Sequence, residues 1–453
     1  MRVLTIVTPI LTLVFRGLFA IACLVLSIQL RHPFMANVRS GLFGLMLIVA
    51  VGLVAFEIWQ LKKKLFLSKI ISFFIVGITS VAIAVLLGSE IKFNLLKQTV
   101  MTANPSTLET LGQHFVVGYR DFDEIQTLVS KRAIGGVFIT RRNIENKTKA
   151  EIQQDLATLQ AMRRDQNLPP LWIATDQEGG IVSRLSPPLT QLPPLSSVIT
   201  NTVSLEQQKN EVLRYASTQA QELSELGVNL NFAPVVDLNK GIVNPNDRYS
   251  QIYQRAISSE ASVVQQVALW YCQTLEKYGV NCTLKHFPGL GGVFNDTHIE
   301  AAELNTSVNE LAQADWLPFQ SIIRQSNAFL MLGHVKLMAI DSQVPVSFSQ
   351  PVITNIIRQD WQHDGVLITD DFCMQAVYGS QAGIENATVQ ALNASVDLVL
   401  ISFDPDIYYT AMDSVLRAYS SNGLNVKVLE ESDRRLKQKS ILLKTSSTQL
   451  PYD

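Results

Sequence analysis

The segment GVLITDD, residues 365–371, is a short apolar run that ends in two carboxylates. A run of this length predicts a buried strand of a parallel sheet, because such strands are covered on both faces. Seven similar runs occur between residues 115 and 402: FVVGY (115–119), GGVFIT (135–140), LWIATD (171–176), LNFAPVVD (230–237), CTLKHF (282–287), FLMLGHV (329–335) and LVLIS (398–402). Eight predicted strands are the number that an α/β barrel of the (β/α)8, or TIM, type requires.

Amphipathic stretches that predict helices separate these runs. Gly227 directly follows the stretch at 206–226, and Gly279 directly follows the stretch at 260–278. A glycine is common where a helix terminates. The alternating order of strands and helices favours the barrel, with a flavodoxin-like open sheet as the alternative. Neither a GxGxxG segment nor a phosphate-binding loop follows the first run, so the sequence does not support a nucleotide cofactor.

Polar side chains lie where several of the predicted strands end. In a barrel the carboxyl ends of all strands meet at one face, and chemistry belongs there. One charged residue at a strand end is often a structural hydrogen-bond partner, but several together predict a polar pocket. The residues in this position are Asp176, Asp237, Lys285, His286, His334, Asp370 and Asp371.

The segment KHFPGLGGVFNDTH, residues 285–298, holds the densest group of reactive side chains. Its proline and glycines break both helix and strand, so we expect a loop that ends in Asp296-Thr297-His298. A histidine close to a carboxylate can act as a general acid/base, because the acidic neighbour stabilises the imidazolium and raises the histidine pKa. The alternative is a structural loop histidine that Asp296 holds in place.

Asp370 and Asp371 end the run at 365–371, where burying a charge is costly unless it is paired or used. A carboxylate that faces a sugar-sized pocket can attack an anomeric carbon or stabilise an oxocarbenium-like transition state. Metal binding is the competing interpretation, since imidazole and carboxylate are both metal ligands. No HxH pair in the first run, no HExxH and no GxSxG are present, so we expect no metal, no other cofactor and no serine hydrolase.

Four segments, in order along the chain, resemble glycoside hydrolase family 3 and in particular its short β-N-acetylhexosaminidase branch. The resemblance runs from about Gln113 to Ser402, and three of the predicted strands carry its motifs. The segments are ATDQEGGIVSRL (174–185), KHFPG (285–289), DTH (296–298) and ITDDFCM (368–374).

Position by position, the resemblance implies Asp370 as nucleophile and His298 with Asp296 as general acid/base. It implies Asp371 as a neighbour that shapes the turn and Glu178 as a structural partner of the Gly-Gly turn. Residues that would bind the sugar hydroxyls and the N-acetyl group are Asp176, Arg184, Arg255, Lys285 and His286. Three departures from the family's pattern bear on the shape of the pocket, namely Ile181, Leu290 and Cys373.

The resemblance implies a retaining exo-glycosidase that removes terminal β-linked N-acetylglucosamine from glycans derived from the cell wall. About 50 residues follow the last predicted strand, so we expect the acid to come from a barrel loop and not from a second domain. Two alternatives stay open on the same fold: a β-glucosidase or phosphorolytic glycosidase, and a carbohydrate-binding barrel without activity.

Residues 1–97 predict a membrane anchor that precedes a barrel domain at 98–453. Three apolar stretches, roughly 3–30, 41–61 and 66–88, are each long enough to cross a hydrocarbon core. Arg16 lies within the first stretch and must find a partner or water. Residues 1–97 hold ten of the 37 basic and two of the 39 acidic residues, which leaves the remainder acidic. A nucleic-acid partner is therefore not expected, since it requires clustered positive charge.

The connection with Lys62, Lys63 and Lys64 is predicted to be cytoplasmic, which places residue 98 onward on the other side of the membrane. We expect the cytoplasmic membrane of a bacterium, with the catalytic domain on its outer side. Six Asn-x-Ser/Thr sequons are interpreted as incidental, since a glycan on Asn295 would crowd His298. Cys272 and Cys282 could pair, although a cysteine at the start of a strand is more often simply buried.

Overall fold

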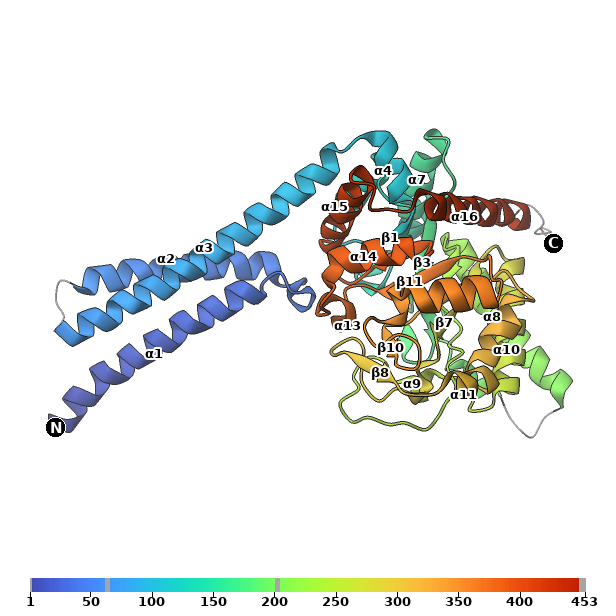
Figure 1. Ribbon diagram of the computed structural model, residues 1–453, viewed down its shortest axis with the longest axis horizontal. Helices are drawn as coiled ribbons and strands as arrows, with labels where there is room; N and C mark the ends of the chain where they lie inside the picture. The colour runs from blue at the N-terminus through green and yellow to red at the C-terminus, as the bar shows by residue number, and fades with distance from the viewer. Residues whose placement is uncertain (1, 62–65, 200–203, 448–453) are drawn as a thin grey trace. The chain divides into compact units, whose positions relative to one another are not determined.

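The computed structural model describes residues 2–61, 66–199 and 204–447 of the chain (Figure 1). It divides the chain into two compact units, Met1–Thr102 and Ala103–Asp453. The first unit is helical and the second contains every strand that the structure describes.

Three long helices make up the first unit: α1 (Arg2–Gln29), α2 (Arg39–Leu61) and α3 (Phe66–Thr102), with a short 3-10 helix η1 (Pro33–Met35) between the first two. Each contains a span that is long and apolar enough to cross a membrane: Leu11–Gln29, Arg39–Leu61 and Ser68–Thr102. The three predicted spans are thus three helices, and α3 continues past the expected end at residue 88. Lys62, Lys63 and Lys64 lie outside the described residues.

Two arginines of this unit, Arg16 and Arg39, have partners on or next to a neighbouring helix. Arg16 Nη1 in α1 donates to Glu57 Oε1 in α2 at 2.7 Å, and the Glu57 side chain is fully buried. The buried Arg39 at the start of α2 donates through Nε to the carbonyl oxygen of Leu30, just past the end of α1. The partner that Arg16 requires inside an apolar span is therefore a carboxylate from the neighbouring helix.

Eight parallel strands of the second unit close into a barrel in the order β1-β12-β11-β9-β7-β6-β3-β2. This confirms the predicted barrel and rules out the open sheet, because β1 pairs with both β2 and β12. Seven of the predicted runs contain one of these strands, and the eighth, 282–287, coincides with β7 except for its first residue. Their bounds are β1 (Phe115–Gly118), β2 (Gly136–Phe138), β3 (Trp172–Thr175), β6 (Leu230–Asn231), β7 (Asn281–Phe287), β9 (Phe329–Leu332), β11 (Leu367–Asp371) and β12 (Leu398–Ile401).

Side chains from the strands fill the barrel and form its core. Phe138 and Phe232 stack with ring centroids 5.7 Å apart, and Trp172 meets Phe329 edge-on at 5.2 Å. Leu436, from the last described helix α16 (Val426–Ser447), belongs to the same buried cluster. The barrel interior is thus a packed core and not a channel.

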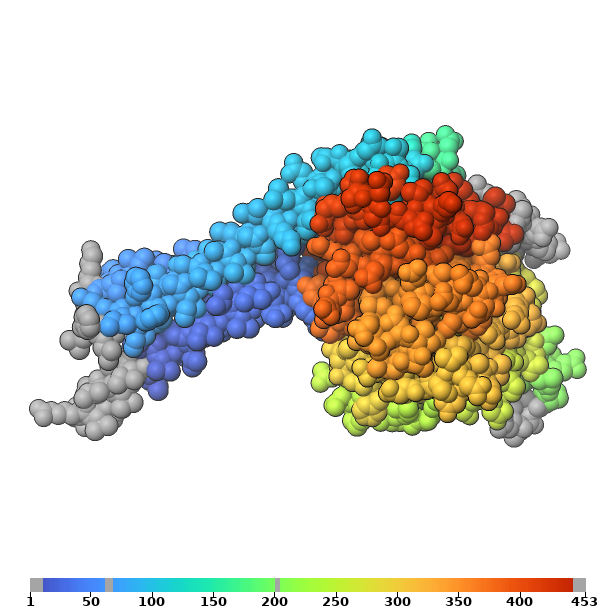
Figure 2. Space-filling view, viewed as in Figure 1, coloured from blue at the N-terminus to red at the C-terminus, as the bar shows by residue number. Residues whose placement is uncertain are grey.

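Helices surround the strands, and in the space-filling view the segments coloured orange and red form a continuous surface over the barrel (Figure 2). Helix α8 (Leu205–Leu226) begins with a capping box of Ser204 and Gln207 and ends at Gly227, whose φ of 97° is the left-handed conformation expected of a terminal glycine. The other α-helices are α4 (Pro105–Gly112), α5 (Phe122–Ser130), α6 (Arg141–Ile144), α7 (Lys149–Asp165), α9 (Ile252–Arg255), α10 (Ala261–Lys277), α11 (Val308–Gln313), α12 (Trp316–Ile323), α13 (Gln375–Tyr378), α14 (Gly383–Asn393) and α15 (Ile407–Ser420).

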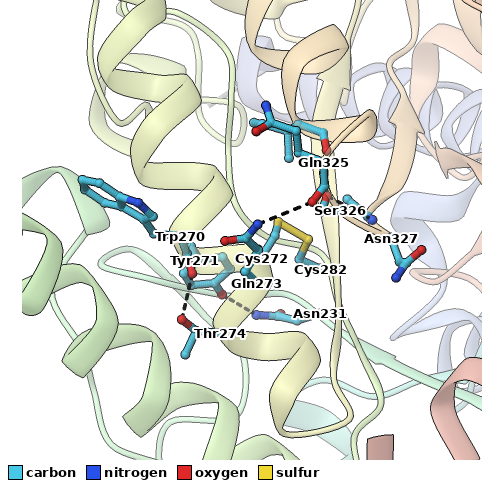
Figure 3. Close-up of a disulfide and its surroundings, with 12 residues drawn as sticks. Asn231, Trp270, Tyr271, Cys272, Gln273, Thr274, Cys282, Gln325, Ser326 and Asn327 are labelled. Atoms are coloured by element: carbon cyan, nitrogen blue, oxygen red, sulfur yellow. Dashed lines mark hydrogen bonds between the residues drawn. A yellow bond between two sulfur atoms is a disulfide. The ribbon is translucent and has the colours of Figure 1, made fainter. Parts of the chain in front are cut away.

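A disulfide joins Cys272 in α10 to Cys282 at the start of β7, with 5.3 Å between the two Cα atoms (Figure 3). The pairing that the sequence left open is therefore present. The bond fixes the helix before β7 to the base of the strand that carries Lys285 and His286 at its other end. Cys23 and Cys373 are free and buried.

Candidate active site

The predicted polar residues lie together at the carboxyl-terminal face of the barrel, because parallel strands all end there. Asp370 and Asp371 close β11, and Lys285 and His286 lie near the end of β7. The register shifts in β11 between Ile368 and Asp371 relative to β12, and β7 shifts near the same end relative to β9. Such irregularities redirect side chains, and here they occur beside the reactive residues.

Both carboxylate oxygens of Asp371 accept hydrogen bonds that hold neighbouring loops in place. Its Oδ1 accepts hydrogen bonds from the amides of Cys373 and Ser402, and its Oδ2 accepts from Ser402 Oγ at 2.6 Å and from the amide of Phe403 at 2.9 Å. Asp371 therefore ties the end of β11 to the loop after β12 and shapes the turn, as the sequence suggested.

Asp370 has a different environment. Among the described residues its carboxylate accepts one hydrogen bond, from the amide of Asp371 at 2.8 Å. Burial raises the pKa of Asp370, but the charges of His286, His334 and His298 outweigh burial and hold the pKa below its usual value. Asp370 is thus an ionised carboxylate with unused acceptor capacity, which a nucleophile needs.

Asp296 and His298 form a dyad on the loop after β7. His298 Nδ1 lies 2.8 Å from Asp296 Oδ1, and the fully buried carboxylate also accepts from Ser250 Oγ at 2.9 Å. The amides of Arg248 and Tyr249 donate to its other oxygen. Although burial raises the pKa of Asp296, its bond to His298 and the imidazolium charge hold it well below the usual range. The charged Asp296 orients Nδ1 inward and leaves Nε2 of the half-buried His298 for proton exchange.

Backbone hydrogen bonds bring this dyad to the segment that follows Asp370. The amide of Gln375 donates to the carbonyl oxygen of His298 at 3.1 Å, and the amide of Ala376 donates to that of Thr297 at 3.2 Å. The loop after β7 and the loop after β11 are therefore joined at the residues that carry the dyad. The effect of His298 on the pKa of Asp370 reflects the same proximity.

A buried group of charges lies beneath these loops. Lys285 Nζ contacts Asp176 Oδ1 at 2.8 Å and Glu178 Oε1 at 2.6 Å, and Arg255 donates to both oxygens of Glu178. Burial raises the pKa of Glu178, but Arg255 and Lys285 reverse the effect and lower it to about 2. The Asp176 side chain is the most exposed of these acidic partners, at 24%. Asp176 thus faces the opening, whereas Glu178 holds the two cations.

His286 is held by a second buried carboxylate. Its Nδ1 lies 2.7 Å from Oδ2 of Asp237, which also accepts from the amides of His286 and Leu290. This arrangement fixes the ring so that Nε2 points away from Asp237, and Nε2 lies 3.5 Å from Arg255 Nη2. Asp237 therefore positions both His286 and the first turn of the loop that leads to the dyad.

The model of the glycosyl hydrolase family 3 N-terminal domain matches residues 106–438, about three quarters of the chain. The chain belongs to glycosyl hydrolase family 3. A β-hexosaminidase of Nitrosomonas eutropha is 34% identical over 291 residues, which are 63% of this chain and 77% of that protein. A β-hexosaminidase of Neisseria meningitidis serogroup C is 32% identical over 294 residues, or 64% of this chain and 78% of the relative.

Two solved structures superpose on most of this chain. A β-N-acetylglucosaminidase from Paenibacillus sp. FPU-7 superposes with a TM-score of 0.67 at 28% identity, covering 74% of this chain and 62% of that chain. A β-N-acetylhexosaminidase from Beutenbergia cavernae has a TM-score of 0.64 at 26% identity and covers 73% and 97% respectively. The sequence resemblance to family 3 is thus confirmed.

The structure places most of the site residues named from the sequence at or just after the carboxyl ends of the barrel strands. Arg184 differs from the rest: it is exposed, and its guanidinium makes no hydrogen bond within the described parts of the chain. Arg255 also differs, because its guanidinium is 7% exposed and engaged with Glu178 and Ser250. His334 is fully buried between Ser347 Oγ and the carbonyl oxygen of Asp371, and it belongs to the core wall behind β11.

Sequence reasoning missed three members of this family 3 site. Glu178 was expected to support the Gly-Gly turn, but its carboxylate instead joins Arg255 and Lys285. Ser250 and Tyr249 lie on an irregular loop without periodicity or motif, so no sequence signal marked them. Across the described ranges, no group of three His, Cys, Asp or Glu side chains is arranged to hold a metal ion.

Proposed function

We propose that this chain is a membrane-anchored retaining exo-glycosidase that removes terminal β-linked N-acetylglucosamine from glycans derived from the cell wall. The observation that carries the proposal is the pair of backbone hydrogen bonds that join the loop after β7 to the loop after β11. The segment after Asp370 is hydrogen-bonded to the backbone of Thr297 and His298, which supports a site in which a carboxylate and an imidazole act on one sugar. The β-hexosaminidases of Nitrosomonas and Neisseria support the choice of sugar.

In the first step, the Asp370 carboxylate attacks the anomeric carbon while protonated His298 donates its Nε2 proton to the leaving oxygen. The glycosidic bond breaks and a glycosyl-enzyme ester forms with inverted configuration. In the second step, neutral His298 removes a proton from water, the hydroxide attacks the same carbon, and Asp370 leaves as a carboxylate. The sugar keeps its β configuration, and no cofactor takes part.

The remaining predicted residues would hold the sugar. Asp176 is partly exposed, and the buried Lys285 lies behind it with Nζ 2.8 Å from its carboxylate, so Asp176 would bind a sugar hydroxyl while Lys285 holds the carboxylate in place. His286, fixed by Asp237, would offer Nε2 to a third polar group. Arg184 is free to reach the N-acetyl group or the next sugar, whereas Arg255 would act through Glu178 and Ser250.

The test of the reaction is Asp370→Asn, which keeps the shape of the side chain but removes the nucleophile. Turnover of chitobiose should fall by about 10⁴-fold or more, since no ester can form. A fluorinated N-acetylglucosamine that keeps its 2-acetamido group should label Asp370 in the wild type, as found by peptide mass. The exposed Asp360→Asn is the control that should keep full activity. Full activity in Asp370→Asn would refute the assignment, and turnover that requires added phosphate would favour the phosphorolytic alternative.

We also infer that residues from 98 onward lie outside the cytoplasm, on the outer side of the bacterial cytoplasmic membrane. Disulfides persist in oxidising compartments and are rare in the cytosol, and the Cys272–Cys282 bond supports that placement. Alkaline phosphatase fused after residue 97 should be active, and the same reporter fused within 62–64 should be inactive. The reverse pattern would overturn the topology.

A further inference from the structure

We propose that a cavity at the amino-terminal face of the barrel is a second binding site, and that its ligand carries a phosphate group. The cavity has a volume of about 360 Å³ and lies between the loop before β9, the loop before β11 and helix α16. His363 lines it and precedes β11, whereas Asp370 lies at the other end of that strand. The cavity is therefore separate from the proposed active site, and the inference does not depend on the glycosidase reaction.

The side chains that line the cavity carry an excess of positive charge. Three are cationic, Arg324, Arg435 and Lys439, and one is acidic, Asp364. Asp364 is already held by Arg434, whose Nη2 donates to both of its oxygens. The chain from residue 98 onward is acidic overall, so a positive cavity stands out in it. Such a concentration of one sign of charge favours a ligand of the opposite sign.

Lys439 supplies a buried positive charge that forms no ion pair within the described parts of the chain. It is 8% exposed, and its Nζ donates to the carbonyl oxygen of Asn327. An ammonium has three N–H donors, so two are left for a ligand. Burial lowers the pKa of Lys439 to about 8, because the charged form is costly without a counterion. An anion in the cavity would offset that cost.

His363 adds a buried donor that lacks a partner. The residue is 9% exposed, and its Nε2 has no hydrogen-bond partner among the described residues. Burial and the charge of Arg358 lower the pKa of His363 to about 4, so the ring is neutral at pH 7 and one of its nitrogens carries a hydrogen. A buried polar group without a partner requires an explanation, and a bound ligand supplies one.

The positions of the donors favour a phosphate group over a carboxylate. Lys439 belongs to α16, the exposed Arg324 directly follows α12, and His363 precedes β11, so the donors come from three separate segments. A phosphate group is tetrahedral and presents several acceptor oxygens, whereas a carboxylate is planar and presents two. A volume of about 360 Å³ lies at the lower end of the range for small-molecule sites, which fits a phosphate ester.

The loop before β9, which forms one wall, is held in place by helix α10. Asn327 Nδ2 donates to Glu276 Oε1, and Gln273 Nε2 donates to the carbonyl oxygen of Gln325. Figure 3 shows this loop next to Cys272, whose disulfide fixes α10 to β7. A preformed wall loses little entropy when a ligand binds.

The competing interpretation is that the cations serve only the carbonyl groups at the carboxyl end of α12, where positive charge is favourable. Thermal unfolding of the full-length protein in neutral detergent at pH 7 separates the two. Inorganic phosphate is compared with sodium chloride at equal ionic strength, because salt screens charges. Phosphate should raise the Tm of the wild type by about 2–5 °C, along a curve that saturates at millimolar concentrations.

Lys439→Met should lose the saturable shift. Arg324→Gln, at an exposed position, should raise the half-saturating concentration about threefold. Lys437→Met, exposed on the same helix, is the matched control and should keep the wild-type curve. Phosphate also stabilises proteins by exclusion from their surface, but that effect does not saturate and is common to all variants.

Equal saturable shifts in the wild type and in Lys439→Met would overturn the proposal. Phosphatidylglycerol added to the detergent tests the source of the phosphate group. A shift that depends on Lys439 with this lipid, at concentrations where free phosphate has no effect, would identify a lipid headgroup, and a shift with free phosphate alone would identify a soluble ligand. The absence of a shift with both probes would overturn the proposal and leave the cations to α12.

Failure of the proposed function would look different from failure of this inference. Lys439→Met and Arg324→Gln should hydrolyse chitobiose within about twofold of the wild type, because neither residue belongs to the proposed active site. A protein without activity on chitobiose would contradict the proposed function and leave the phosphate curves unchanged.

Discussion

Ser250 connects the acid/base dyad to the buried charges beneath it. Its hydroxyl donates to Asp296, and its carbonyl oxygen accepts from Arg255 Nη1 at 2.7 Å. Arg255 in turn binds Glu178, which also binds Lys285. A continuous set of hydrogen bonds therefore runs from the strand that carries Lys285 to His298.

Ser250→Ala should move the acidic limb of the pH profile. The substitution keeps the carbonyl group but removes one donor to Asp296, so the pKa of Asp296 rises toward its usual value. Asp296 must be ionised to stabilise the His298 imidazolium, and the acidic limb of kcat/KM therefore shifts to higher pH, with about a tenfold loss at the optimum. Ser250→Thr, which keeps a hydroxyl, is the control. An unchanged limb in the alanine variant would exclude this role.

Glu178→Gln should destabilise the fold in a pH-dependent manner. The pKa of about 2 in the folded state lies below the usual value of 4.5, so the ionised form stabilises the native state above about pH 4.5. That contribution disappears as the pH falls toward 2. We expect a loss of about 3–5 kcal/mol at pH 7, because two buried cations lose their partner, and a smaller difference from wild type at pH 3. Thermal unfolding at pH 7 and pH 3 measures the loss of stability in Glu178→Gln. The exposed Glu225→Gln is the control. A loss of the same size at both pH values would contradict the prediction.

At the scale of the element, the loop after β7 passes very close to the segment after β6. A Cβ added to Gly291 would lie 1.8 Å from the carbonyl oxygen of Leu238, whereas one added to Gly292 would lie 3.5 Å from Leu304 Cδ1. The first is a clash with backbone, and the second is ordinary contact.

Gly291→Ala should therefore displace the loop that leads to the dyad. We expect kcat/KM to fall by about 10²-fold or more, since a misplacement of about 1 Å is enough for such a loss. Gly292→Ala, one residue along, should keep activity within about twofold. Steady-state kinetics of the two variants checks the pair. Equal activities would show that the close approach to Leu238 does not set the position of the dyad.

Helix α16 carries a buried lysine that weakens the fold at neutral pH. Lys439 is 8% exposed, lies 5.3 Å from the ring centroid of Phe329 and donates to the carbonyl oxygen of Asn327. Burial lowers its pKa from 10.5 to about 8. The unfolded chain therefore binds more protons between pH 8 and 10.5, and stability rises with pH across that window.

Lys439→Met should stabilise the protein at pH 7 by on the order of 1–2 kcal/mol, because it removes the cost of burying an ammonium. The gain should shrink as the pH rises from 8 through 10.5, since the lysine is neutral in both states only above that range. Thermal unfolding over this range measures it, and the exposed Lys437→Met should change little. Destabilisation at pH 7 would mean that the bond to Asn327 outweighs the burial cost.

The strands were predictable because their signal is local. A buried parallel strand such as 398–401 is a continuous apolar run, and a helix such as 205–226 begins with Ser204 and ends at Gly227. The partners of Glu178 were not predictable, since Arg255 and Lys285 are far away in sequence and meet Glu178 only after the barrel closes. Motif residues such as His298 were found, whereas Ser250 lies in a loop whose hydrogen bonds depend on another loop.

At the scale of the whole molecule, an ion pair joins the apolar helices α1 and α2 of the first unit, Arg16 with Glu57. Leaving a single charge in hydrocarbon costs about 2.5–3.5 kcal/mol on insertion scales. We therefore expect Glu57→Leu to lower the amount of protein in the membrane severalfold, because Arg16 loses its partner. Arg16→Leu with Glu57→Leu should restore most of the loss. Quantitative immunoblots of membrane fractions test the cycle, and a double variant no better than the single one would show that the pair has no such role.

The length of the apolar stretches was enough to predict three helices. The position of Arg16 in the middle of the first stretch was enough to predict that its charge needs a partner. Sequence could not identify Glu57 as that partner, because it depends on how α1 and α2 lie together. The orientation of the unit in the membrane depends on the charges around Lys62, Lys63 and Lys64, and it stays a prediction.

Because β1 pairs with β12, the barrel can close only late in the synthesis of the chain. The register Phe115 with Val399 joins the first strand of the ring to the last, so the ring cannot close until nearly the whole barrel has been translated. Until then, β1 and the newest strand both expose unpaired edges, which are sites of aggregation. Three helices that are apolar enough to span a membrane precede β1, so an anchor of this kind would be made before the first of these edges appears.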